Sequence, residues 1–149
     1  MLIVIKTPPY KNEDPLGFLY IALSAVSSGQ ETTVVFVEKG LYCLLKHVDE
    51  FENDIASPKL EKGIEKSTSI PHIYRLNDLI MQLVGEVKFY YIPTENPTFP
   101  VILRSEAEIC EDQKPHLTQK DLIMGVKKWS FKKLYEKMYS EGENLLIVW

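Results

Sequence analysis

The chain alternates between short, continuous apolar runs and longer segments whose apolar residues recur every three or four positions. Four runs are candidate strands, at residues 2–6, 32–37, 87–92 and 145–149. Because they show no polar alternation, they are typical of strands buried on both faces, as in a parallel sheet. A shorter run at residues 126–129 predicts a fifth strand.

Helical spacing separates the first three runs. Asp14 followed by Pro15 is typical of an N-cap and a first helical position, and apolar residues then recur at helical spacing until Gly29. A second amphipathic helix is predicted over residues 73–84, and residues 41–46 predict a short apolar helix or turn. Strand, helix and strand joined by short links form a βαβ unit.

Two further helices are predicted in the second half of the chain. Thr118 is placed to cap a helix over residues 119–124. Ser130 is placed to cap the next helix, whose apolar side chains form one stripe that fits the core. The stripe consists of Phe131, Leu134, Tyr135 and Met138.

Two segments fall outside this pattern. Residues 47–70 are acidic, and we expect a solvated excursion there and no domain boundary. Residues 93–116 are rich in proline, with a small strand at residues 101–103 and a turn of helix at residues 107–110. The pattern as a whole predicts a single α/β domain over residues 1–149, in three α/β/α layers around a five-stranded, mainly parallel sheet.

Composition narrows the class of protein. A chain of 149 residues with 45% hydrophobic residues can bury a core without metals or disulfides. Its net charge of −4 argues against a nucleic-acid partner, and no apolar run approaches the ~20 residues of a membrane span. We therefore expect a soluble cytoplasmic protein with no membrane association.

Cofactor motifs are not found in the loops where an open parallel sheet binds ligands, beyond the carboxyl ends of its strands. These loops are residues 7–14, 38–43, 93–115 and 126–130. None has a G-x-G-x-x-G or P-loop pattern, so we expect no nucleotide cofactor. His47, His72 and His116 have no metal-ligand spacing, and no G-x-S-x-G elbow is present, so neither a metal site nor a serine hydrolase is expected.

Both cysteines, Cys43 and Cys110, fall in these loops and are the candidate catalytic residues. Cys43 stands among leucines, where a thiol is typically an inert apolar side chain with a raised pKa. Cys110 lies in a polar loop whose exposure favours reactivity, whereas Glu111 and Asp112 disfavour the thiolate. The inert interpretation is the better one for Cys43, and both interpretations stay open for Cys110.

Five lysines gather near the C-terminal end, at positions 127, 128, 132, 133 and 137. A solvated helix face is the simple interpretation, and a docking patch for an acidic partner protein is the alternative. The neighbouring rings of Trp129, Phe131 and Tyr135 fit a core stripe better than a stacking surface for nucleic acid.

Four segments in a fixed order carry a family resemblance: LIVIKTPPY, TTVVFVEKGLYCLL, LIMQLVGEVKFYYI, and DLIMGVKKWSFKKLYE with LLIVW. The chain resembles the DsrE/DsrF-like family, which includes the TusB, TusC and TusD sulfur-relay subunits, and it is most similar to the DsrF/TusC branch. The resemblance implies a DsrE-like three-layer fold. It also implies assembly with copies of itself or with related subunits into dimers, trimers or hexamers.

In the catalytic branch of this family, a cysteine at the end of the third strand carries a persulfide. The matching position here is Ile92, so the carrier residue is replaced. Two functions then follow from the resemblance. In the first, Cys110 carries the persulfide for sulfur relay, Cys43 is a neighbouring or resolving thiol, and a small sulfur-carrier protein is a partner. In the second, the chain is a non-catalytic structural subunit of a homo- or hetero-oligomer.

Both functions predict exposed apolar surface, because obligate interfaces resemble a core cut in half. Neither needs a cofactor or a metal. The candidate interface residues are Tyr90 or Tyr91, Phe99 and Trp149.

Overall fold

The computed structural model describes residues 1–9, 14–44, 66–93, 102–103, 116–117 and 122–148. Its main element is a five-stranded sheet in which all neighbours run parallel. The strands are β1 (Leu2–Ile5), β2 (Thr33–Phe36), β3 (Lys88–Tyr91), β6 (Lys127–Lys128) and β7 (Leu145–Val148). Their order across the sheet is β6-β3-β2-β1-β7. The predicted fold class is therefore confirmed.

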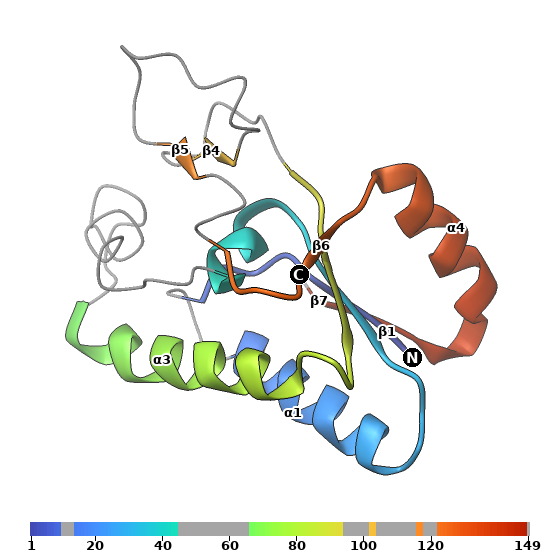
Figure 1. The fold of residues 1–149 in the computed structure, drawn as a ribbon, viewed down its shortest axis with the longest axis horizontal. Coiled ribbons are helices and arrows are strands. Elements are labelled where there is room, and N and C mark those ends of the chain that lie inside the picture. Colours follow the sequence, from blue (N-terminus) through green and yellow to red (C-terminus); the bar gives the residue numbers. More distant parts are fainter. Residues whose placement is uncertain (10–13, 45–65, 94–101, 104–115, 118–121, 149) are drawn as a thin grey trace.

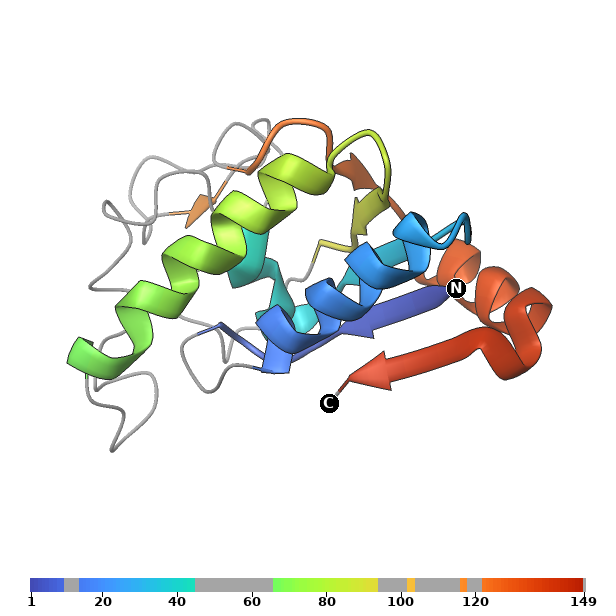
Figure 2. The same ribbon diagram turned by 90° about the horizontal axis from the view of Figure 1, so that it is seen from below.

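Helices lie on both faces of this sheet (Figure 1). Helices α1 (Asp14–Ser27) and α3 (Lys66–Leu83) lie side by side on one face, as Figure 2 also shows. Helix α4 (Phe131–Glu141) is the described helix that covers the opposite face, which completes three layers. Two 3₁₀ helices, η1 (Glu38–Leu44) and η5 (Gly142–Asn144), follow β2 and precede β7.

Each central strand contributes to two cores. Ile3 and Ile5 of β1 face the cluster closed by α1 and α3. Leu2 and Val4 face the smaller cluster beneath α4. Because neighbouring residues of a strand point to opposite faces, a strand covered on both sides is apolar at every position. This explains the unbroken apolar run at the start of the chain.

The strands match the five predicted runs. Strand β1 is one residue shorter than predicted and β2, β3 and β6 are two residues shorter, while β7 covers all of its run that the structure describes. Of the predicted strand at residues 101–103, the structure has β4 (Ile102–Leu103), which pairs in parallel with the unpredicted β5 (His116–Leu117). The turn predicted at residues 107–110 lies outside the described residues.

Two predicted helices differ from what the structure shows. Helix α3 begins at Lys66, so the last residues of the predicted excursion at 47–70 are helical, while residues 47–65 lie outside the described range. The helix predicted over residues 119–124 is wrong for residues 122–124, which form a bridge and a turn; residues 119–121 are not described. There the Ile123 N–H donates to the Leu44 carbonyl oxygen at 2.9 Å, which anchors the chain to η1.

The predicted cap of α4 is confirmed. The Ser130 hydroxyl accepts a hydrogen bond from the Lys133 N–H at 3.3 Å, and Gly142 ends the helix with a φ of 57°. A serine at this position satisfies an amide that has no partner within the helix. None of the helices in the described part of the chain is long and apolar enough to cross a membrane.

Candidate functional site

The carboxyl ends of β1, β2, β3 and β6 meet at one edge of the sheet because these strands are all parallel. Residues 6–9 follow β1, η1 follows β2, Ile92 follows β3 and Trp129 follows β6. This is the edge at which open parallel sheets bind ligands. The predicted loops therefore gather there, as far as they are described.

A tight turn after β2 brings η1 against the end of β1. The Val37 N–H donates to the Ile5 carbonyl oxygen at 2.9 Å, and the Gly40 N–H donates to the Val37 carbonyl oxygen at 2.9 Å. Between them Glu38 has a φ of 50°, a left-handed conformation that is uncommon for residues other than glycine. Its carboxylate forms an ion pair with the Lys6 ammonium group at 3.0 Å, which holds the turn to the residue after β1.

Cys43 lies within η1 and is buried. Its Sγ donates to the Thr7 carbonyl oxygen at 3.8 Å, across the contact between η1 and the loop after β1. Desolvation raises the pKa of the Cys43 thiol well above its ordinary value, so the side chain is neutral in the folded chain. The burial predicted from its leucine neighbours is confirmed. Since the thiolate is the nucleophile, the burial of Cys43 and its raised pKa both disfavour reactivity at this thiol.

The buried thiol is expected to make the free energy of unfolding depend on pH. In the unfolded chain Cys43 ionises above its ordinary pKa of 9.0, whereas the folded chain keeps the proton. The free energy of unfolding is therefore expected to fall as the pH rises above about 9, by up to ~1.4 kcal/mol per pH unit from this thiol. Urea unfolding of the native chain and of Cys43→Ala between about pH 8 and 10.5 measures the difference. Equal slopes in the two chains would contradict the burial of a neutral thiol.

The other sequence-predicted thiol, Cys110, lies outside the described residues. Ile92, which the sequence resemblance aligns with a carrier cysteine, is buried in the cluster beneath α4. Its N–H donates to the Phe36 carbonyl oxygen at 3.0 Å, which continues the pairing of β3 with β2 beyond the last strand residue. The Ile92 side chain is thus part of the core and almost fully shielded from solvent.

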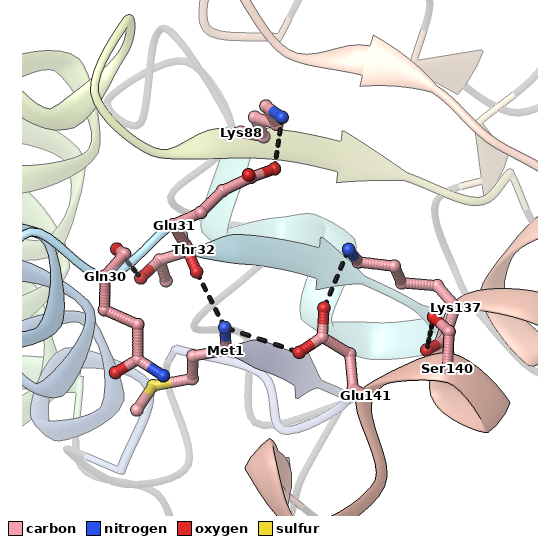
Figure 3. A network of polar contacts seen from close by, with 8 residues as sticks. All are labelled: Met1, Gln30, Glu31, Thr32, Lys88, Lys137, Ser140 and Glu141. Atoms are coloured by element: carbon pink, nitrogen blue, oxygen red, sulfur yellow. Dashed lines mark hydrogen bonds and ion pairs between the residues drawn. The ribbon is translucent and has the colours of Figure 1, made fainter.

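The opposite edge of the sheet carries a polar network (Figure 3). The Met1 amino group donates to the Glu31 carbonyl oxygen at 2.7 Å and forms an ion pair with Glu141 at 3.5 Å. Lys137 forms a second ion pair with Glu141 at 2.7 Å, and Lys88 pairs with the Glu31 carboxylate.

Hydrogen bonds from lysine set the ionisation of this network. The bond from Lys88 lowers the pKa of Glu31, and the bond from Lys137 lowers the pKa of Glu141. Both carboxylates are therefore ionised near neutral pH, and their contacts tie β1, β3 and the end of α4 together. The network has the character of a structural clamp.

The stripe predicted on α4 is wrong for two of its residues. Leu134 is buried and Met138 partly buried, but Phe131 and Tyr135 are 46% and 62% exposed, and Tyr139 is 95% exposed. The Phe131 and Tyr135 rings stack on each other, with centroids 6.2 Å apart. The one helix described on this face buries only the side chains that point directly at the sheet, so the flanking rings stay exposed.

The structure also differs from the prediction of exposed interface residues. Tyr91 is buried, and Tyr90 is half-buried because its ring stacks on Trp129 at a centroid distance of 4.2 Å. Phe99 and Trp149 lie outside the described residues. Other apolar side chains are exposed in their place: Tyr20 47% and Ile21 41% on α1, and Met81 50% on α3.

A sequence signal marks the exposed face of α1: no charged residue occurs between Pro15 and Ser27. A surface helix normally carries charge on its outer side, so a helix without charge indicates that the outer side is covered. The periodicity of this segment predicts the helix, but only the lack of charge reveals the apolar outer surface.

In the part of the chain that the structure describes, no group of three or more His, Cys, Asp and Glu residues is arranged to hold a metal ion. No protein-family model matches the chain, and no curated protein matches it significantly.

Proposed function

We propose that this chain is a DsrE/DsrF-like subunit of an oligomeric sulfur-relay complex, and that it contributes binding surface and no reactive thiol. The sequence segments that resemble the family support this, and so does the three-layer fold around five parallel strands. The sulfur would then reside on a partner subunit.

The outer face of α1 is the observation that carries the proposal. It exposes Tyr20 and Ile21 without a neighbouring charge on the helix, and α3 beside it exposes Met81. Cores of protein interfaces are depleted in charge and enriched in aromatic residues and methionine. An uncharged face can also meet its own copy across a twofold axis without electrostatic repulsion. A second copy of this chain is therefore the partner we assign to α1.

Two positions within the described residues support the part of the proposal that concerns chemistry. Ile92 replaces the carrier cysteine and is buried, and Cys43 is buried with its pKa raised by desolvation. A persulfide forms when a thiolate attacks a polysulfide sulfur, so that one S–S bond forms, another breaks and a shorter polysulfide leaves. Neither position offers a thiolate for that attack.

Self-association is the first test. We expect the native chain to sediment as a dimer or larger oligomer, and Ile21→Glu to weaken association about 100-fold, because it places a charge in an apolar interface. Sedimentation velocity over a range of concentrations measures this. Tyr139→Glu is the matched control, because Tyr139 is exposed on α4, which covers the opposite face of the sheet from α1. A native chain that stays monomeric, or an Ile21→Glu variant that associates normally, would contradict the proposal.

A second experiment tests whether the chain takes up sulfur. The reduced protein is incubated with polysulfide, and the mass of the intact protein is then measured. We expect no added sulfur on the native chain and the same result for Cys43→Ala. Added sulfur that disappears in Cys110→Ala would overturn the non-catalytic part of the proposal and make the chain a carrier in its own right. Added sulfur that disappears in Cys43→Ala would contradict the burial of that thiol.

A further inference from the structure

The outer side of α4 carries three aromatic rings, each one turn from the next: Phe131, Tyr135 and Tyr139. Residues four apart lie on the same side of a helix, and the stacked rings of Phe131 and Tyr135 show this arrangement directly. Leu134 and Met138 attach the helix to the sheet, so the core does not need the three rings. Tyrosine is also one of the residue types enriched among those that contribute most to the binding energy of protein interfaces.

Lysines lie near these rings. Residues three apart are neighbours on a helix, so Lys132 lies beside Tyr135. Lys127 and Lys128 on β6 are exposed just before the helix begins. Lys127 is level with Tyr90 and points to the face of the sheet that α4 covers, whereas Lys128 is level with Tyr91 and points to the other face. Ion pairs among the described residues involve Lys6, Lys88 and Lys137 and none of these three lysines.

The charge of this region differs from that of the whole chain. Residues 127–142 contain five lysines and two glutamates, a net charge of +3, whereas the whole chain carries −4. One of the two glutamates, Glu141, is already paired with Lys137 and the Met1 amino group. The three rings and Lys132, which we call the α4 patch, therefore lie in a local positive field that attracts anionic groups.

From this juxtaposition we propose that the α4 patch binds an acidic protein segment that carries apolar side chains. Its apolar side chains contact the rings of Tyr135 and Tyr139, and its carboxylates pair with Lys132 and with Lys127 of β6, which points to the same face of the sheet. A second copy of this chain does not fit, because two α4 patches face to face would bring lysines against lysines.

Nucleic acid fits the α4 patch less well than an acidic protein segment. Residues 127–142 contain no arginine, the residue best suited to phosphate, and Glu136 lies among the lysines. Proteins that bind single strands stack the bases in a positively charged groove, whereas the outside of a lone helix is convex.

The α4 patch and the α1 face lie on opposite sides of the sheet (Figures 1 and 2). A partner on α4 therefore leaves α1 free for self-association. The inference goes beyond the proposed function, and each can fail while the other holds.

Fluorescence anisotropy with a labelled synthetic peptide tests the inference. The probe is a helical peptide with leucines at helical spacing and glutamates between them, and its counterpart has lysine in place of every glutamate. We expect saturable binding of the acidic peptide alone, weakened by added salt. Tyr135→Ser and Lys132→Glu are each expected to weaken binding about tenfold, which corresponds to ~1.4 kcal/mol.

Two variants control for general effects. Arg75→Glu on α3 changes the net charge as Lys132→Glu does, and Met124→Ser removes an exposed apolar side chain elsewhere. Both are expected to bind like the native chain, with unchanged circular dichroism. No binding of the acidic peptide, or an equal loss in Arg75→Glu, would overturn the inference. So would tighter binding of an oligothymidylate that Tyr135→Ser abolishes, because that result assigns the patch to nucleic acid.

Discussion

A Gly40→Ala variant is expected to lose about 3 kcal/mol of unfolding free energy, because the added methyl group meets backbone and no flexible side chain. A Cβ at this position would lie 2.9 Å from the Ile5 carbonyl carbon, closer still to its oxygen, and 3.3 Å from the Lys6 Cα. Ile5 cannot retreat, since β1 is paired with β2 on one side and β7 on the other. Urea unfolding followed by circular dichroism measures the loss.

Gly17→Ala is the matched control. Gly17 lies within α1, and a Cβ there would meet nothing within 4 Å. Alanine in a helix interior is favoured over glycine by roughly 0.5–1 kcal/mol, so this variant is expected to gain stability. Both variants are compared at a concentration at which the chain is monomeric, so that association does not contribute. A loss below about 1 kcal/mol in Gly40→Ala would mean that η1 can move away from β1.

The central strands are predictable because both of their faces are buried. In β1 and β2 every side chain is covered, whichever face it points to. A continuous apolar run in the sequence therefore predicts a strand that is buried on both faces. Only the ends differ, since Lys6 and Val37 lie just beyond the paired residues.

The aromatic residues of α4 show where this argument stops. Leu134 and Tyr135 both belong to the stripe that the periodic pattern predicts, yet one is buried and the other exposed. Periodicity identifies the side of a helix that is richest in apolar residues. How wide a strip the sheet covers depends on how many helices share that face, and one described helix covers a narrow strip.

Residues 122–124 fail as a helix for a tertiary reason. Leu122 and Ile123 are buried, and the Ile123 amide pairs with the Leu44 carbonyl oxygen and with no residue of its own segment. Gly125 then turns the chain with a φ of 91°, packed against Val84 so closely that a Cβ would collide with its side chain. The pairing with η1 is non-local, so local propensity does not reveal it.

Of the candidate site, the burial of Cys43 could be predicted because its sequence neighbours are leucines that pack around it. The turn that holds it could not be predicted. Glu38 takes a left-handed backbone conformation. A sequence predicts this conformation at glycine or asparagine, but not at glutamate. Its ion pair with Lys6 joins a residue after β2 to a residue after β1. This contact becomes evident only once the order of the strands in the sheet is known.

Leu134→Ala is expected to lower the free energy of unfolding by about 3 kcal/mol. Alanine buries less apolar surface than leucine, and the missing side-chain atoms leave a cavity in the core. Leu134 is the buried side chain by which α4 joins the cluster around Leu2, Val4 and Val35. We also expect amides of α4 to lose protection against hydrogen exchange before those of β1. Urea unfolding and native-state exchange measure the two effects.

Tyr139→Ala is the control on the same helix, since it removes a larger side chain that is almost wholly in water. We expect its unfolding free energy to stay within about 0.5 kcal/mol of the native value. If Leu134→Ala costs less than about 1 kcal/mol, then α4 is held to the sheet chiefly by its polar end, where Glu141 meets Lys137 and the Met1 amino group. If the expected loss is found, binding of the acidic peptide should weaken with it, because the rings keep their spacing only while the helix is seated on the sheet.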